Sequence, residues 1–378
     1  DARVQKAAEE ALAGRRAAVV AIDPRNGDVL AFVSTPTFDP NGFARGLTYA
    51  EYAALSENID VPLFDRALRG EYPPGSTIKP FVALAGLESG LRKPEDRIYS
   101  SGEFFLPGQR RGYRDSHRGG HGMVDLYSSI SESVNTYYYR LAMDLGIVRF
   151  DAYMRRYGFG QPTGIDLVGE VSGIVPSPEW KRTRFKQPWF LGETVIAGIG
   201  QGYWVVTPLQ LAQGTAGLAN GGFRIPLRLV RQVRVGLNQP WKMLPKPETT
   251  SFGATPEQLQ AINQGMQMTM HTPRGTGYAI GAGAPYRIAG KTGTVQKISR
   301  KGNISMDPKN LPLHLRHQAL FIGYAPADDP KIAVAVIVEH GGYGASSAGP
   351  IARRMMDAYL LKTPAPVKAP LPALEETP

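Results

Sequence analysis

Short apolar runs near both ends of the chain predict β-strands. Close to the N-terminus, two such runs are joined by Pro24-Arg25-Asn26-Gly27, and Asn-Gly between β-type runs is a strong hairpin signal. Residues 325–330, rich in Pro and Asp, join the last two runs with similar turn chemistry. Strands are therefore expected at residues 17–22, 29–34, 286–289, 318–324 and 331–339.

The middle of the chain has the apolar spacing of helices, interrupted by Gly and Pro. An Ala-rich helix is expected at residues 1–13, and further helices at 75–89, 124–145, 147–156, 207–219 and 255–270. A sheet built from both chain ends around a helical middle is an α+β arrangement rather than a series of βαβ units. Residues 363–378 contain five prolines and few large apolar groups, which predicts a disordered tail.

Composition narrows the chemistry. Among 378 residues there is no cysteine, which excludes a thiolate nucleophile, a disulfide framework and a Cys-ligated metal. The net charge is +10, but the basic residues are scattered and no zinc-finger or RNA-binding motif accompanies them, so we expect no nucleic-acid partner. No apolar run approaches the roughly 18 residues of a membrane span. Asp1 begins either a mature chain or a trimmed one.

Without cysteine, a covalent mechanism needs another nucleophile, and Ser76 is the strongest candidate. It follows Pro73-Pro74-Gly75 at the expected start of a helix, and Lys79 lies one turn later on the same face. A neutral amine at that distance can take the proton of the hydroxyl, provided that burial and a nearby cation lower the lysine pKa. Taken alone, the pair is more simply a helix N-cap followed by a surface lysine.

Two further groups strengthen that hypothesis by their order along the chain. Ser133 and Asn135 lie two residues apart inside the helix expected at 124–145, where a serine alone is more simply a packing residue. Lys291-Thr292-Gly293-Thr294 follows the strand expected at 286–289, and alone it reads as a Gly-rich turn. In this group Lys291 supplies a second ammonium, and Gly293 leaves room for a ligand backbone beside the strand.

Ser-x-x-Lys, then Ser-x-Asn, then Lys-Thr-Gly is the motif order of penicillin-binding proteins and serine β-lactamases. Over nearly its whole length the chain resembles the transpeptidase domain of class B penicillin-binding proteins. Among these proteins, it is most similar to the subgroup that acts in cell elongation. The supporting segments are residues 21–24, 27–31, 38–41, 114–115, 120–122, 198–202, 207–210 and 321–326.

The resemblance implies a fold, an organisation and a reaction. It implies the penicillin-binding/serine β-lactamase-like fold, with residues 1–362 as the transpeptidase domain and a helical subdomain at approximately 75–270. The implied reaction is D,D-transpeptidation of peptidoglycan stem peptides through a serine acyl-enzyme during cell elongation, with β-lactams as inhibitors. The implied location is the periplasmic face of the bacterial inner membrane, with an N-terminal anchor helix outside this sequence. The implied partners are a polytopic glycosyltransferase and elongation scaffold proteins.

The same resemblance assigns roles to the motif residues. It makes Ser76 the nucleophile and Lys79 its general base, with Ser133 and Lys291 relaying a proton to the leaving D-alanine and Asn135 binding the peptide amide. Substrate would also contact Thr292, Gly293 and Thr294, and the backbone N–H groups of Ser76 and Thr294 would form the oxyanion hole.

Metal binding and rival functions remain open at this point. Asp96, Asp115 and His121 match three ligands of a zinc site in some members of the subgroup, but Val134 stands where the fourth ligand, a cysteine, would be. We therefore expect no cofactor, and Asp115 and His121 would instead order a loop through hydrogen bonds. The alternatives to a transpeptidase are a serine β-lactamase, with Glu170 or Glu193 as the deacylating carboxylate, and a non-catalytic penicillin-binding sensor.

Overall fold

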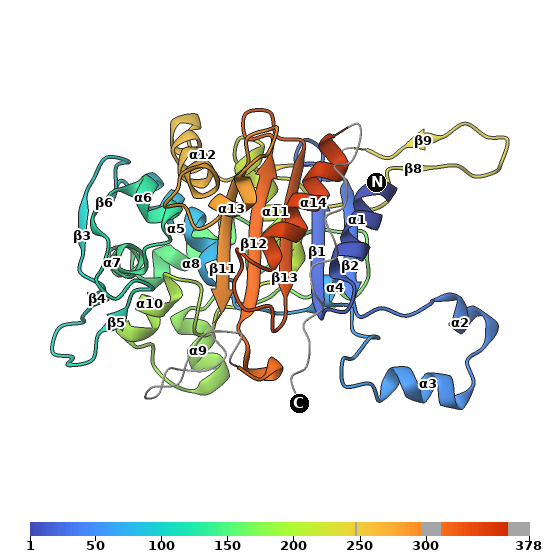
Figure 1. The fold of residues 1–378 in the computed structure, drawn as a ribbon, viewed down its shortest axis with the longest axis horizontal. Helices are drawn as coiled ribbons and strands as arrows, with labels where there is room; N and C mark the ends of the chain where they lie inside the picture. The colour runs from blue at the N-terminus through green and yellow to red at the C-terminus, as the bar shows by residue number, and fades with distance from the viewer. Residues whose placement is uncertain (246–247, 296–310, 362–378) are drawn as a thin grey trace.

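The structure is a computed structural model that describes residues 1–245, 248–295 and 311–361. Two lobes lie side by side, a sheet covered by helices and a mainly helical lobe (Figure 1). The expected tail at 363–378 lies outside the described residues. Within the described residues, no helix combines the length and the apolar composition that crossing a membrane requires.

The sheet has five antiparallel strands that come from both ends of the chain. Their order is β11-β12-β13-β1-β2. The bounds are β1 (Ala17–Ile22), β2 (Val29–Thr35), β11 (Ala289–Val295), β12 (Gln318–Ala325) and β13 (Ile332–Val338). The expected α+β arrangement is confirmed, and four of the five expected strands lie where they were predicted.

Burial on both faces explains why the central strands are continuous apolar runs. Every residue of β1 and β13 is buried. Alternate residues of β1 (Ala17, Val19 and Ala21) pack towards α1 (Ala2–Leu12) and α14 (Ala348–Leu360), which cover the front of the sheet in Figure 1. The intervening residues pack towards α11 (Pro208–Ala219) and the helical lobe. A strand covered on both faces has no polar side.

The N-terminal hairpin forms where Asn-Gly predicts it. The backbone N–H groups of Asn26 and Gly27 both donate to the carbonyl of Asp23. Gly27 has φ +77°, and a Cβ there would lie 2.6 Å from the carbonyl oxygen of Pro226. Glycine is required at this turn for both its dihedral and the close approach of another loop.

The helical lobe lies next to β11 and carries the first two motifs. Its helices are η1 (Gly75–Ile78), α5 (Lys79–Glu88), α6 (Leu126–Ser131), α7 (Asn135–Leu145), α8 (Ile147–Arg156), α9 (Pro178–Phe185), α10 (Leu191–Ala197) and α12 (Pro256–His271). The expected helix at 124–145 is wrong as a single element, because it is two helices separated by residues 132–134. The other expected helices of the middle of the chain are present, although the one at 75–89 begins as the 3-10 turn η1.

Several smaller elements complete the described chain. The remaining helices are α2 (Asn41–Arg45), α3 (Tyr49–Ser56), α4 (Arg66–Arg69), α13 (Tyr278–Gly281) and η3 (Leu313–Leu315). The remaining strands form two-stranded pairs, β3 (Ile98–Ser100) with β6 (Gly122–Val124), β4 (Glu103–Phe104) with β5 (Tyr113–Arg114), β7 (Phe223–Arg224) with β10 (Thr250–Ser251), and β8 (Gln232–Val233) with β9 (Lys242–Met243).

Candidate active site

Ser76 lies in a tight turn that the sequence before it enforces. Pro74 precedes η1, and Gly75 has φ +53° and donates its N–H to the carbonyl of Gly200 at 2.9 Å. A Cβ at Gly200 would lie 2.3 Å from the carbonyl oxygen of Gly75, so both positions need glycine. The turn leaves Ser76 half-buried, immediately before the buried helix α5.

Lys79 is completely buried, and its amine is held by the second motif. Its Nζ donates to the carbonyl of Ser133 at 2.7 Å, to Oδ1 of Asn135 at 2.7 Å and to Oγ of Ser133 at 3.2 Å. Burial lowers the pKa of Lys79 to about 7, partly opposed by the carboxylate of Asp115. The pKa shift that the sequence hypothesis required is therefore present, with burial as its main cause.

Ser133 and Asn135 lie at the break between α6 and α7. Ser133 has φ +60°, an uncommon conformation for a residue with a side chain, and Asn135 begins α7. The carboxylate of Asp115 accepts the backbone N–H of Thr136 at 2.8 Å and its hydroxyl at 3.0 Å. This contact satisfies an N–H group at the start of α7, so the second helix can begin here without a capping side chain of its own.

The third motif lies within β11, and the expected strand at 286–289 is wrong. The strand begins at Ala289 and includes the whole Lys-Thr-Gly-Thr segment, whose register pairs Thr292 with Phe321. The backbone N–H of Ile288 donates to Nε2 of His271 instead of to a neighbouring strand. Two glycines and a lysine have little strand preference, and pairing with β12 overrides that local preference.

Lys291 and Gly293 bring β11 close to the first motif. Lys291 is completely buried, and burial together with the charge of Lys79 lowers its pKa well below the usual range. A Cβ at Gly293 would lie 2.7 Å from Cγ2 of Thr77. A Cβ at Gly75 would lie 3.3 Å from the carbonyl oxygen of Thr294. The residues before and after Ser76 therefore both lie against β11.

The structure thus brings the predicted motif residues into one cluster. Lys79, Ser133 and Asn135 are in direct contact, Lys291 lies within electrostatic reach of Lys79, and Gly293 adjoins the residue that follows Ser76. In the described sheet β11 is an edge strand, with no strand paired to one of its sides, which is the position where a peptide strand can add to a sheet.

The three candidate zinc ligands do not fit a metal site. Asp96 accepts the backbone N–H of Lys93, whereas Asp115 binds Thr136 and His121 binds Glu132 through Nδ1 at 2.9 Å. In the part of the chain that the structure describes, no group of three or more His, Asp or Glu side chains could hold an ion. Asp115 and His121 order this loop through hydrogen bonds and an ion pair instead.

Asp115 and His121 shift each other's pKa in opposite directions. Although burial opposes it, His121, the N–H of Thr136 and Lys79 together hold the pKa of Asp115 well below its usual range. The neighbouring carboxylate of Asp115 raises the pKa of His121, and Glu132 adds to the effect.

Sequence reasoning missed three residues that border the cluster. Glu132 lies between the two motif helices, and Arg274 and Thr276 follow α12. Arg274 donates to Glu132 at 2.7 Å, and the hydroxyls of Thr276 and Thr292 lie 2.7 Å apart. Glu132 is part of the Ser-Glu-Ser-Val-Asn segment, which was a usable signal, whereas Pro-Arg-Gly-Thr-Gly at 273–277 looks like an ordinary turn.

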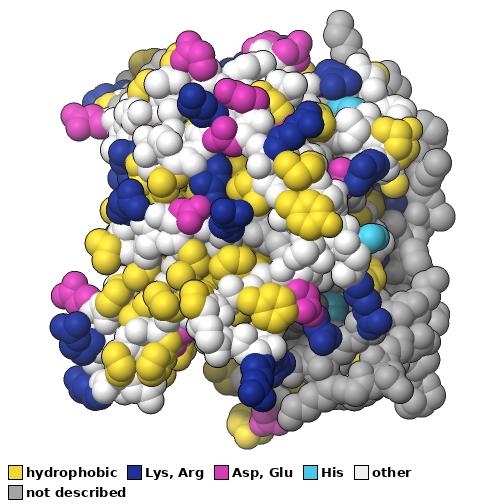
Figure 2. Space-filling model, turned by 90° about the vertical axis from the view of Figure 1, so that its left-hand side faces the viewer, with side chains coloured by type: hydrophobic (Ala, Val, Ile, Leu, Met, Phe, Trp, Pro, Cys, Tyr) yellow, Lys and Arg dark blue, Asp and Glu magenta, His cyan; other side chains and the backbone are white. Residues whose placement is uncertain are grey.

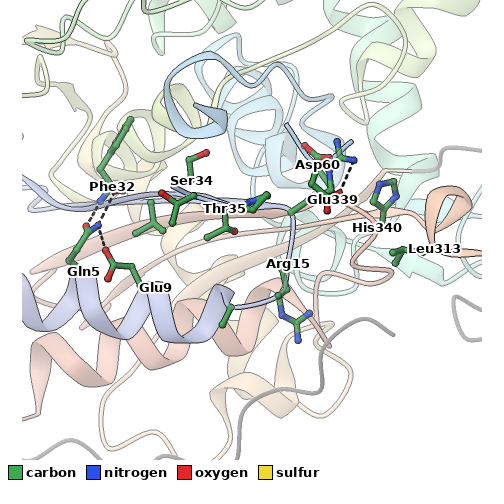
Figure 3. A pocket seen from close by; sticks show the side chains of 16 residues that line it. Gln5, Glu9, Arg15, Phe32, Ser34, Thr35, Asp60, Leu313, Glu339 and His340 are labelled. Atoms are coloured by element: carbon green, nitrogen blue, oxygen red, sulfur yellow. Dashed lines mark hydrogen bonds and ion pairs between the residues drawn. The ribbon is translucent and has the colours of Figure 1, made fainter. Parts of the chain in front are cut away.

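A separate cavity of about 590 Å³ lies away from this cluster, between α1 and the end of β2. Its lining includes Gln5, Phe32 and Glu339 (Figure 3), and it contains none of the motif residues. Glu339 binds Arg16 at 3.0 Å and Arg66 at 3.1 Å. These contacts join β13 to the segment before the first motif, which is a structural role.

Surface charge on the helical lobe is mixed. Figure 2 shows Lys and Arg side chains interspersed with Asp and Glu on this face, while hydrophobic side chains gather in its lower half. Exposed large residues that directly follow β4 or lie at the start of α10 include Phe105, Phe190 and Leu191. A basic stripe of the kind that binds nucleic acid is not visible on this face.

Comparison with known proteins agrees with this geometry. Residues 17–357 match the family model of the penicillin binding protein transpeptidase domain. Peptidoglycan D,D-transpeptidase MrdA of Salmonella typhimurium is 39% identical over 358 residues, which are 94% of this chain and 57% of that protein. The chain therefore spans less than three fifths of the length of this relative.

Solved structures show the same similarity. Pseudomonas aeruginosa PBP2, in complex with WCK 5153, has a TM-score of 0.86 and 45% identity, with 98% of this chain and 79% of that chain covered. Helicobacter pylori PBP2, in complex with MreC, has a TM-score of 0.81 and 32% identity, with 94% of this chain and 62% of that chain covered.

Proposed function

The chain belongs to the penicillin binding protein transpeptidase family, and we propose that it is a serine D,D-transpeptidase that cross-links peptidoglycan stem peptides during cell elongation. One observation carries the proposal. Lys79 is a buried amine with a pKa of about 7, one helical turn after a half-buried serine and in contact with both residues of the Ser-x-Asn motif.

Acylation follows from the donors and acceptors around Lys79. A neutral amine has two N–H bonds, which the carbonyl of Ser133 and Oδ1 of Asn135 accept. The third, longer contact, to Oγ of Ser133, is then not a donation by the amine, whose lone pair can take a hydroxyl proton. Oγ of Ser76 gives that proton to Lys79 as it attacks the carbonyl carbon of the penultimate D-Ala. The N–H groups of Ser76 and Thr294 stabilise the oxyanion, and losing one such donor costs about 3 kcal/mol of barrier.

Collapse of the tetrahedral intermediate requires a proton for the departing D-alanine nitrogen. The hydroxyl of Ser133 is the donor, and it is reprotonated by Lys79, whose Nζ lies 3.2 Å from it. The buried amine of Lys291 is electrostatically coupled to Lys79, so a proton on Lys79 disfavours a proton on Lys291. In the second step the amine of a neighbouring stem peptide attacks the ester carbonyl, loses its proton along the same path in reverse, and releases Ser76.

Substrate binding uses the open edge of β11. A stem peptide would add as a strand beside Gly293, with its terminal carboxylate at the hydroxyls of Thr292 and Thr294 and an amide at Asn135. A β-lactam presents a similar carboxylate and a strained amide, so it would acylate Ser76 and leave slowly.

The structure disfavours the β-lactamase alternative. Glu170 accepts hydrogen bonds from the N–H and the hydroxyl of Thr163, and Glu193 binds Lys181 and the N–H of Phe190 at the start of α10. Both candidate carboxylates are thus committed to structural contacts, and neither contacts Lys79 among the described residues. These contacts disfavour Glu170 and Glu193 as general bases for a deacylating water.

The proposal extends to partners and location. Helicobacter pylori PBP2 forms a complex with MreC, which supports an elongation scaffold protein as a partner of this chain. A polytopic glycosyltransferase that supplies the glycan strands is the second proposed partner, and the periplasmic face of the inner membrane is the proposed location.

Labelling with a fluorescent penicillin tests the nucleophile and the fate of the acyl group. The wild-type protein should gain one label that persists for hours, and Ser76→Ala should gain none at the same folded concentration. A label lost within seconds would indicate a β-lactamase. Release of D-alanine from a stem peptide with a D-amino acid as acceptor then separates a transpeptidase from a non-catalytic sensor.

A further inference from the structure

The segment at residues 273–277, here named the strap, links the two walls of the candidate active site. It follows the C-terminal end of α12, a helix that packs against both α6 and β11. The backbone N–H of Thr276 donates to the carbonyl of Ser131 at 3.0 Å, and its hydroxyl lies 2.7 Å from the hydroxyl of Thr292. One residue therefore contacts the wall that carries Ser133 and the strand that carries Lys291.

The strap is held tightly against its own helix, so its position is well defined. A Cβ at Gly275 would lie 2.3 Å from the carbonyl oxygen of Thr269, and a Cβ at Gly277 would lie 2.6 Å from Sδ of Met270. The N–H of Gly277 donates to the carbonyl of Thr269 at 3.0 Å. At Gly275 the close atoms are backbone, so only glycine permits this approach, which fixes Thr276 relative to α12.

Arg274 adds a second contact to the same wall. Its guanidinium lies 2.7 Å from Oε2 of Glu132, and that carboxylate also contacts Nδ1 of His121 at 2.9 Å. Glu132 directly precedes Ser133, whose φ of +60° must be maintained by its surroundings. The side chain of Arg274 is 73% exposed, so this ion pair contributes little to global stability. Its position next to Ser133 points to a role in local geometry.

We propose that Thr276 and Arg274 are positioning residues, and that Thr276 orients the hydroxyl of Thr292 towards the carboxylate of the bound substrate. This inference rests on the proposed transpeptidase function, because it assigns that carboxylate to Thr292. A hydroxyl can donate only one hydrogen bond. The inferred arrangement therefore has Thr276 donating to the hydroxyl of Thr292 at 2.7 Å, which fixes the rotamer of Thr292 and leaves its one hydrogen for the carboxylate of the ligand.

The test removes one hydroxyl from the protein and one carboxylate from the ligand. Thr276→Val keeps the backbone N–H and the side-chain shape, and Thr276→Ser restores the hydroxyl. Acylation by a penicillin should slow roughly 10- to 100-fold in Thr276→Val and by less than about threefold in Thr276→Ser. With the methyl ester of the same penicillin, the Thr276→Val penalty should fall to less than about twofold, because the ligand no longer presents a carboxylate.

Thr272→Val is the matched control, because the hydroxyl of Thr272 donates only to the carbonyl of Met268 within α12. It should acylate at the wild-type rate with both ligands. An equal penalty for the acid and the ester in Thr276→Val would show a merely structural role and overturn the inference, as would no penalty with either. If the wild-type protein is not acylated at all, the proposed function fails instead.

The contribution of Arg274 is tested with a double-mutant cycle. Arg274→Gln and Glu132→Gln should each slow acylation about threefold to tenfold, and the double variant should be no slower than the worse single variant. The Arg274→Gln effect should shrink between low and 1 M salt, since one partner is largely exposed. Independent, multiplying effects or an effect that salt does not change would exclude a positioning role for the pair.

Discussion

The pKa of Lys79 leads to a quantitative prediction about the pH dependence of acylation. Moving a lysine pKa from 10.5 to about 7 corresponds to about 5 kcal/mol of preference for the neutral amine. At pH 7.5 roughly three quarters of Lys79 would be neutral, compared with about a thousandth for an ordinary lysine. The second-order rate of acylation by a penicillin should therefore rise with pH to a plateau above 7, and at pH 5 it should be about 1% of the plateau.

Substitution of Asp115 tests whether the pKa of Lys79 sets this pH dependence. Its carboxylate raises the pKa of Lys79, so Asp115→Asn should move the inflection of the rate profile below pH 7. Asparagine keeps an oxygen that can accept the N–H of Thr136, and a thermal melt checks that the variant is folded. Asp151→Asn, in α8, removes a carboxylate that pairs with Arg155 and should leave the inflection unchanged.

Stopped-flow measurement of acylation from pH 5 to pH 9 is the assay. His121 also titrates with a raised pKa, so the inflection must persist in His121→Asn if Lys79 is its source. A rate that does not change between pH 5 and pH 8 would refute the assignment of Lys79 as the base. An inflection that moves to higher pH in Asp115→Asn would refute the electrostatic reasoning.

The lowered pKa of Lys79 also determines how the free energy of unfolding changes with pH. Because the folded-state pKa of Lys79 is lower than its unfolded-state value, the unfolded chain binds the extra proton between pH 7 and pH 10.5. The free energy of unfolding contributed by this group therefore rises with pH across that window.

Three further predictions concern single positions and metal content. Gly293→Ala should slow acylation per folded molecule by at least about tenfold, because the added methyl would lie 2.7 Å from Cγ2 of Thr77 beside the nucleophile, and penicillin labelling measures this. Gly27→Ala should lower the free energy of unfolding by about 1–3 kcal/mol through its φ of +77°, measured by urea denaturation, with unchanged acylation per folded molecule. Elemental analysis should find less than about 0.1 zinc per chain, and Zn²⁺ addition should not raise the melting temperature, since Val134 supplies no thiolate.

Sequence reasoning succeeded where chemistry restricts the residue types. The three motifs were recognised from their order, and Lys79, Ser133 and Asn135 do lie in contact. The N-terminal hairpin and the central strands were also predictable, because Asn-Gly and fully apolar runs are strong local signals.

The failures occurred where tertiary contacts override local preference. Residues 124–145 have helical spacing throughout, and the contacts of Asp115 with Thr136 and of Lys79 with Ser133, which hold the break in the helix, come from distant segments. Strand β11 has glycines where a strand is normally apolar, and its pairing with β12 decides its structure. Helix α14 was not predicted, although its buried face covers the sheet.

The order of the strands in the sheet has a consequence for biosynthesis. Strand β1 is synthesised well before its partner β13, which comes more than three hundred residues later, with Ala17 opposite Val338. Until then one edge of the wholly apolar strand β1 has no partner, and an unpaired apolar edge is prone to aggregation. The turn that carries Ser76 likewise meets β11 only after β11 has paired with β12. A nascent chain should therefore not react with a penicillin before its last strands have folded.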